Sequence, residues 1–166
     1  QALPKGDKLD TVIQKAVECG AARIVPFESE RCIVHIKKEA EAHKTERRQR
    51  IATEAAKQCG RGILPEVLPS VTFPEMLDAA KEAELTLFCY EGDGTVPIGR
   101  LLAGVTPEKV RRIAVVIGSE GGFSLDEAEK AKNAGFLLTG LGKRILRTET
   151  AATFALAAIC AVTELS

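Results

Sequence analysis

The feature that most limits the fold of this chain is an apolar run, Ile113 to Ile117, that ends at a glycine. The run lacks the alternating polar residues of a half-solvated strand, so it predicts a strand covered on both faces. Ser124 and Glu127, three residues apart, predict a capping box that opens a helix, and this helix ends at Gly135. A buried strand followed by a helix is typical of an α/β fold with a parallel sheet.

Strands and helices alternate along most of the chain. Apolar residues recur at helical spacing in several stretches, and Gly20 and Gly60 follow the last periodic residue of two of them. This alternation predicts one α/β domain, with a mainly parallel sheet and helices on both of its faces. The expected strands span 23–27, 85–90, 113–117 and 136–139, the helices 9–17, 45–59, 73–83, 124–135 and 149–162, and two loops 91–99 and 140–148.

Composition narrows the class of protein. Of the 166 residues, 45% are hydrophobic and 28% are charged, which excludes a disordered chain. No apolar run approaches the roughly 20 residues of a membrane-spanning helix. The five cysteines are scattered, and none has metal-ligand spacing with His35 or His43. We therefore expect a cytoplasmic protein in a reducing compartment, with no metal and no membrane partner.

The formal net charge of zero conceals an uneven distribution. Residues 37–61 hold eight basic and four acidic side chains, whereas residues 71–142 hold seven basic and eleven acidic ones. A basic stretch of this kind is typical either of a solvated helix face or of a surface that binds an anionic partner. The charges alone leave both interpretations open.

Three unusual loops follow buried strands in the second half of the chain. They span Tyr90–Gly94, Gly118–Gly122 and Gly140–Arg144, and each contains at least two glycines. Because ligands of parallel sheets bind beyond the carboxyl ends of the strands, these loops are expected to form a single pocket lined by backbone amides. None of them matches a phosphate-binding P-loop or a dinucleotide-binding motif, and plain turns are the alternative interpretation.

The stretch after the last strand places cations in an unfavourable position. Lys143, Arg144 and Arg147 directly precede a helix start, where the helix dipole disfavours positive charge. Either these side chains point away from the helix or they meet an anion. Thr148 is expected to be the N-cap of the helix, and Glu149 is a favourable first-turn acid.

Two of these stretches carry a resemblance to a known family. Ile117–Ser124, with the sequence IGSEGGFS, and Leu141–Ala151, with the sequence LGKRILRTETA, closely resemble the ribosomal RNA small subunit methyltransferase E family. Residues 5–8, 13–16 and 54–61 are also similar to the family, so the resemblance covers nearly the whole chain. The family belongs to the SPOUT class of S-adenosylmethionine (SAM) methyltransferases.

The resemblance implies both a fold and an activity. The implied fold is an α/β sheet whose C-terminal part forms a deep trefoil knot, although true knots are rare among proteins. The implied cofactor is SAM, bound in the knot by the three loops. The implied protein is a homodimer that methylates N3 of one uridine in 16S rRNA near the decoding region. Its partner is then small-subunit rRNA or the assembled small ribosomal subunit.

The resemblance and the chemistry of methyl transfer together imply site residues. Loss of the imide proton places negative charge on the uracil oxygens, which Arg147 is expected to stabilise. Glu120 and Glu149 are candidates for receiving that proton or facing the sulfonium, unless they only cap or pair. Cofactor-binding residues are expected at Tyr90, Glu91, Gly118, Glu120, Gly121, Gly122, Leu141, Gly142, Ile145, Leu146, Thr148 and Thr150, and RNA-binding residues at Lys44, Arg47, Arg48, Gln58, Arg61 and Arg147.

The sequence departs from the family in two respects. Ser119 stands where the family usually has proline. Family members also begin with a small barrel-like (PUA-like) RNA-binding domain, and residues 1–166 correspond to the methyltransferase domain alone, so we expect a fragment of a longer protein. The alternative functions are a SPOUT enzyme acting on another RNA, such as tRNA, and a non-catalytic α/β module that binds RNA or a nucleotide.

Overall fold

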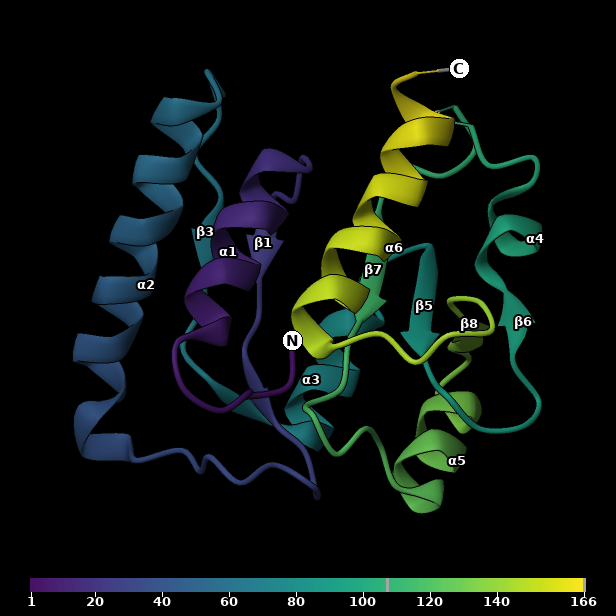
Figure 1. The fold of residues 1–166 in the computed structure, drawn as a ribbon, viewed down its shortest axis with the longest axis horizontal. Coiled ribbons are helices and arrows are strands. Elements are labelled where there is room, and N and C mark those ends of the chain that lie inside the picture. The colour runs from purple at the N-terminus through teal and green to yellow at the C-terminus, as the bar shows by residue number, and fades with distance from the viewer. Residues whose placement is uncertain (107, 166) are drawn as a thin grey trace.

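The main sheet consists of four strands: β5 (Leu85–Cys89), β6 (Val96–Pro97), β7 (Ile113–Val116) and β8 (Leu137–Gly140). The computed structural model describes residues 1–106 and 108–165, and its strand order across this sheet is β6-β8-β5-β7 (Figure 1). All neighbouring strands are parallel, with Leu87 opposite both Val115 and Leu137. The predicted parallel sheet is confirmed.

Helices cover both faces of this sheet. In β5, Leu87 packs in a cluster with residues of α1, α4 and α6, whereas the next residue, Phe88, packs in a second cluster with residues of α3 and α5. Successive side chains of a strand point to opposite faces, so the two clusters lie on the two sides of the sheet. The helices are α1 (Lys8–Glu18), α2 (Lys38–Gln58), α3 (Phe73–Ala80), α4 (Ile98–Leu102), α5 (Leu125–Asn133) and α6 (Thr148–Thr163).

Aromatic side chains pack together in the cluster that contains Phe88. The rings of Phe88 and Phe123 have centroids 4.2 Å apart, and Phe27 and Phe73 each lie between 6 and 7 Å from Phe123. Phe123 directly follows the glycine loop 118–122, so the packing of its ring anchors that loop against the sheet.

The N-terminal half adds two small parallel sheets. One pairs β1 (Arg23–Ile24) with β3 (Glu66–Val67), and the other pairs β2 (Phe27–Glu28) with β4 (Val71–Thr72). Ala2 bridges β2 at Phe27, and its N–H donates to the carbonyl of Ile117 at 2.8 Å. The first residues of the chain therefore join the N-terminal half to the end of β7, and they bring Lys5 and Lys8 to the glycine loop.

The structure corrects three predicted boundaries. α2 begins at Lys38 instead of near residue 45, because its first turns are charged and apolar periodicity does not detect them. The predicted strand 23–27 is divided by Pro26 into β1 and β2, since proline has no N–H for a strand ladder. The predicted loop 91–99 contains β6 and the start of α4.

The last strand occupies an inner position of the sheet. β8 lies between β6 and β5, two strands that precede it in the chain. Insertion of late residues between earlier ones is compatible with the expected trefoil knot, and the knot itself stays a prediction. Among the described residues, none of the helices is long and apolar enough to cross a bilayer.

Candidate functional site

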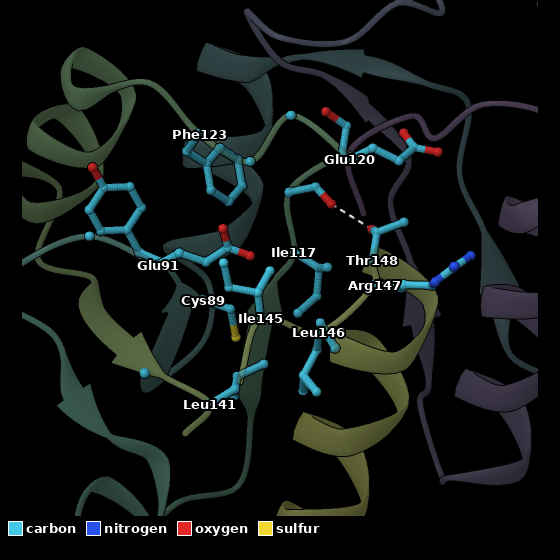
Figure 2. A pocket seen from close by; sticks show the side chains of 18 of the residues that line it. Cys89, Glu91, Ile117, Glu120, Phe123, Leu141, Ile145, Leu146, Arg147 and Thr148 are labelled. Carbon is cyan, nitrogen blue, oxygen red and sulfur yellow. Dashed lines mark hydrogen bonds between the residues drawn. The ribbon is translucent and has the colours of Figure 1, made fainter. Parts of the chain in front are cut away.

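A cavity of about 820 Å³ lies at the carboxyl edge of the main sheet. The loops that follow β5, β7 and β8 all line it, and Figure 2 shows side chains from all three around one space. The prediction that these loops share one pocket is confirmed. The volume is in the range of sites for small organic ligands.

The glycine loop after β7 is folded tightly on itself. Ser119 and Gly122 form an isolated bridge, and the N–H of Gly122 donates to the carbonyl of Ser119 at 3.0 Å. Gly122 has a φ of +64°, which β-branched residues in particular resist, and a Cβ on Gly118 would lie 3.2 Å from the Cα of Gly122. These glycines let the backbone, not side chains, form one wall of the pocket.

The start of α6 is fastened to this loop. The Thr148 hydroxyl donates to the carbonyl of Gly118 at 2.6 Å, drawn as a dashed line in Figure 2, and accepts from the side-chain amide of Gln1 at 2.9 Å. Thr148 is the first helical residue, and Arg147, without a side-chain cap, is the N-cap. The predicted capping role of Thr148 is therefore wrong, because its hydroxyl connects two loops of the pocket instead.

Glu120 is tied to the N-terminal segment. Its carboxylate pairs with the Lys8 ammonium at 2.7 Å and accepts the N–H of Lys5 at 3.0 Å. Partial burial acts to raise the pKa of Glu120, but the hydrogen bonds from Lys8 and from backbone N–H groups outweigh it and hold this pKa below its usual range. An ionised, hydrogen-bonded carboxylate of low pKa is a poor proton acceptor, so the geometry favours a positioning role over the predicted role in catalysis.

The other two predicted catalytic residues differ in placement. Arg147 lines the pocket, is exposed, and extends away from Ile145 and Leu146 in Figure 2. Glu149 does not line the pocket, and its Oε2 atom is buried without a hydrogen-bond partner among the described residues. Glu149 is therefore not placed to meet a ligand there, because its position in the first turn of α6 directs it elsewhere.

The pocket contains most of the residues expected to bind the cofactor. All of them line it except Thr150, which is exposed in the first turn of α6. The lining also includes Ser119, whose buried hydroxyl has no partner in the described part of the chain. Sequence reasoning did not assign Lys8 and Arg31 to the pocket. Lys8 lies in a stretch that resembles the family, whereas Arg31 carries no local signal. Sequence reasoning also missed the lining roles of Cys89, Ile117, Leu125 and Thr95.

The residues expected to bind RNA on α2 and just after its end are mostly engaged within the protein. Arg48 is buried and pairs with Glu41 at 2.9 Å, and Arg61 donates to the carbonyls of Val17 and Ala21 at the end of α1. For Arg48 the prediction is wrong, since its guanidinium is buried in an ion pair. For Arg61, which is half-buried and engages a single guanidinium nitrogen in these bonds, the role in RNA binding stays a prediction. Arg47 is exposed but pairs with an acid of α1, Lys44 is half-buried and Gln58 is exposed. For Lys44, Arg47 and Gln58 the role in RNA binding stays a prediction.

Comparison with known proteins identifies the protein family to which the chain belongs. A profile of the RNA methyltransferase domain family matches residues 1–160, and the chain belongs to this family. It is 37% identical over 166 residues to the ribosomal RNA small subunit methyltransferase E of Bacillus subtilis (strain 168), covering 98% of this chain and 64% of that protein. The crystal structure of a ribosomal RNA small subunit methyltransferase E from Neisseria gonorrhoeae bound to S-adenosyl methionine superposes with a TM-score of 0.82 at 36% identity, covering 98% and 64% of the two chains.

These matches confirm the family recognised in the sequence and its α/β fold. A relative from Synechocystis sp. (strain ATCC 27184 / PCC 6803 / Kazusa), with the same name, is 37% identical over 98% of this chain and 52% of its own length. The chain thus spans less than two thirds of the length of these relatives.

Proposed function

We propose that this chain is the methyl-transferring part of a SAM-dependent rRNA methyltransferase. The observation that carries the proposal is the single pocket built from the three glycine-containing loops at the carboxyl edge of the sheet. The relative from Neisseria gonorrhoeae, crystallised with S-adenosyl methionine, supports the choice of cofactor.

The lining of the pocket fits SAM in chemical character. Ile117, Leu141 and Ile145 offer apolar surface for an adenine ring, and the glycine loop offers backbone groups for the polar parts. The buried Ser119 hydroxyl lacks a partner among the described residues, so a bound ligand is the natural source of one. Glu91 lines the pocket, forms no ion pair with a described residue, and suits a cationic sulfonium. When bound, SAM supplies an electrophilic methyl group.

Arg147 is proposed as the catalytic residue of this chain. Removal of the imide proton from a uracil leaves negative charge on its carbonyl oxygens, and a fixed cation beside them lowers the barrier. Arg147 is a lining residue of the pocket, is exposed, and forms no ion pair with a described residue, so its guanidinium is available to that charge. Glu120 holds the glycine loop through Lys8 and Lys5, which keeps the pocket preorganised.

The proposed target is N3 of one uridine in small-subunit 16S rRNA near the decoding region, within rRNA or the assembled small subunit. The target base has to leave its stack to reach the pocket. The names of the relatives support a small-subunit rRNA substrate, whereas the uridine and its position come from the family resemblance. The proposal also includes a homodimer and an additional RNA-binding domain outside residues 1–166.

Two measurements test the proposal in sequence. Calorimetry with the purified chain is expected to show SAM binding, and no binding at sub-millimolar SAM would reject a methyltransferase. Mass spectrometry of rRNA from a deletion strain is then expected to show loss of one 3-methyluridine. Unchanged rRNA with an altered tRNA would move the target to tRNA, and RNA binding without methyl transfer would identify a non-catalytic module.

A further inference from the structure

Three cations without acidic partners among the described residues lie on the exposed edge of the pocket, called here its mouth. Arg31, Lys143 and Arg144 are exposed, line the pocket, and form no ion pair with any described residue. The acids that line the same pocket are Glu91 and Glu120, and Glu120 is already paired with Lys8. The pocket mouth therefore carries more free positive charge than its own carboxylates can neutralise.

Arg31 is held at this position by contacts of the preceding residue, Glu30, and of its own side chain. The N–H of Glu30 donates to Glu127 at 2.9 Å, and the Glu30 carboxylate accepts from the Ser124 hydroxyl at 2.6 Å, which fastens the segment to the start of α5. One guanidinium nitrogen of Arg31 donates to the carbonyl of Gly121 at 3.0 Å. The other guanidinium nitrogens have no partner among the described residues and remain available.

The contact between Arg31 and the glycine loop leaves no room for a side chain. A Cβ on Gly121 would lie 2.9 Å from the Cβ of Arg31, closer than real Cβ contacts occur. The loop that forms one wall of the pocket and the segment that carries Arg31 therefore fit each other. Such a fit places a cation from the N-terminal half beside a site built from the C-terminal half.

The cofactor proposed above does not explain these charges. SAM has a sulfonium, an ammonium and one carboxylate, so its net charge is positive. Binding of SAM therefore increases the excess of positive charge at the pocket mouth. An anionic second ligand is needed to offset it, and RNA supplies a phosphate on each side of every base. Phosphate contacts to arginine are also favoured by its planar array of donors.

We infer that Arg31, Lys143 and Arg144 form a phosphate-binding rim that holds the RNA backbone next to the target nucleotide. The inference rests on the proposed function, because it takes RNA as the substrate. It assigns the main contact with the RNA backbone to this rim instead of to α2, whose cations are largely neutralised by acids. The rim lies around the pocket itself, so backbone binding and presentation of the flipped base occur at the same place.

The test compares the salt dependence of RNA binding among variants. The chain, saturated with SAM, is titrated against a short fluorescein-labelled single-stranded RNA containing uridine at several salt concentrations. For single strands, each phosphate contact contributes about 0.7 to the slope of log affinity against log salt. The double variant Arg31→Gln/Arg144→Gln is expected to lose about 1.4 from this slope and to bind RNA more weakly, with SAM affinity unchanged.

Two further variants complete the comparison. Arg50→Gln/Lys57→Gln removes two exposed, paired cations of α2 and is expected to leave the slope unchanged. Lys44→Gln/Arg47→Gln removes two cations of α2 that were expected to bind RNA, and it is also expected to leave the slope unchanged.

The inference would be overturned if Lys44→Gln/Arg47→Gln reduced the slope while Arg31→Gln/Arg144→Gln kept the wild-type slope. It would also be overturned by a rim variant whose SAM affinity falls while RNA binding is kept, because the cations would then serve the cofactor. Absence of SAM binding by the unmodified chain rejects the proposed function instead.

Discussion

Helix α2 and the rim of the pocket both contain many basic residues, but they use them differently. On α2, Arg48 pairs with Glu41 inside the protein, and Arg50 and Lys57 pair with acids one turn away. At the rim, Arg31 and Arg144 have no acidic partner among the described residues. A count of basic residues therefore does not show which charges are available to a ligand, since the neutralising acids depend on the folded neighbours.

The comparison is tested most strongly at the buried ion pair of α2. Arg48→Met leaves the Glu41 carboxylate buried without its cation, and the side chains of the pair are only 9% and 11% exposed. Loss of one partner of a buried pair costs about 3–5 kcal/mol, so urea unfolding is expected to show a loss of that size. The control Arg50→Met, at an exposed pair, is expected to cost no more than about 0.5 kcal/mol. Equal stability of the two variants would contradict a structural role for Arg48.

At the pocket, loss of an arginine is expected to reduce catalysis instead of stability. Arg147→Ala removes the cation proposed to stabilise the uracil oxygens, so methyl transfer to small ribosomal subunits is expected to fall about 10²–10³-fold while SAM affinity is largely kept. Single-turnover transfer of a radiolabelled methyl group measures the first quantity and calorimetry the second. Arg100→Ala, at an exposed arginine outside the pocket lining, serves as the control. Near-normal turnover of Arg147→Ala would remove this residue from catalysis.

A substitution in the glycine loop tests whether the loop backbone binds the cofactor. Gly122→Val places a β-branched residue at a φ of +64°, and the loop has to distort to accept it. SAM affinity is expected to fall about tenfold or more, since about 1.4 kcal/mol of strain corresponds to a factor of ten. Gly62→Val, at a position where a Cβ meets nothing within 4 Å, is expected to leave the affinity unchanged. Equal SAM affinities in the two valine variants would argue against a cofactor bound by the loop backbone.

A smaller effect is expected at the unpartnered hydroxyl of the glycine loop. Ser119→Ala removes a group that has no hydrogen bond within the described protein, so the free energy of unfolding is expected to be unaffected or slightly raised. If the hydroxyl binds the cofactor, SAM affinity falls severalfold, since one hydrogen bond contributes about 1 kcal/mol. Calorimetry measures the difference, with Thr53→Ala on α2 as a control. Unchanged affinity would show that the hydroxyl does not contact SAM.

The smallest expected effect is a pH dependence of stability. Although burial acts to raise the pKa of Glu41, hydrogen bonds from Ser70 and the nearby Arg48 outweigh it and lower this pKa. As the pH falls, Glu41 is therefore protonated in the unfolded chain before it is protonated in the folded chain. The stabilisation from Glu41 is complete above about pH 4.3 and is lost as the pH falls through the folded-state pKa of Glu41. Unfolding at a series of pH values is expected to show a loss of stability in acid that is reduced in Glu41→Gln. Parallel curves for the two proteins would contradict this linkage.

Much of the site was predictable because its signals are local. The three glycine-containing loops are each read from a few consecutive residues, and parallel strands bring such loops together at one edge. The places of Arg31 and Lys8 in the pocket were not predictable, since both reach it through hydrogen bonds between segments about one hundred residues apart. The wrong prediction for Arg48 has the same origin, because tertiary packing buries its side chain against Glu41 and Ser70.

The inner position of β8 has a consequence for the order of assembly. A ribosome that has released residues only up to β7 presents β5 and β6 without the strand that separates them. The pocket then lacks the wall that contains Leu141–Thr148, so a chain interrupted before its last quarter has an incomplete site. Ligand binding at this site therefore reports that synthesis has continued past β8, and the ligand stabilises only chains that have done so.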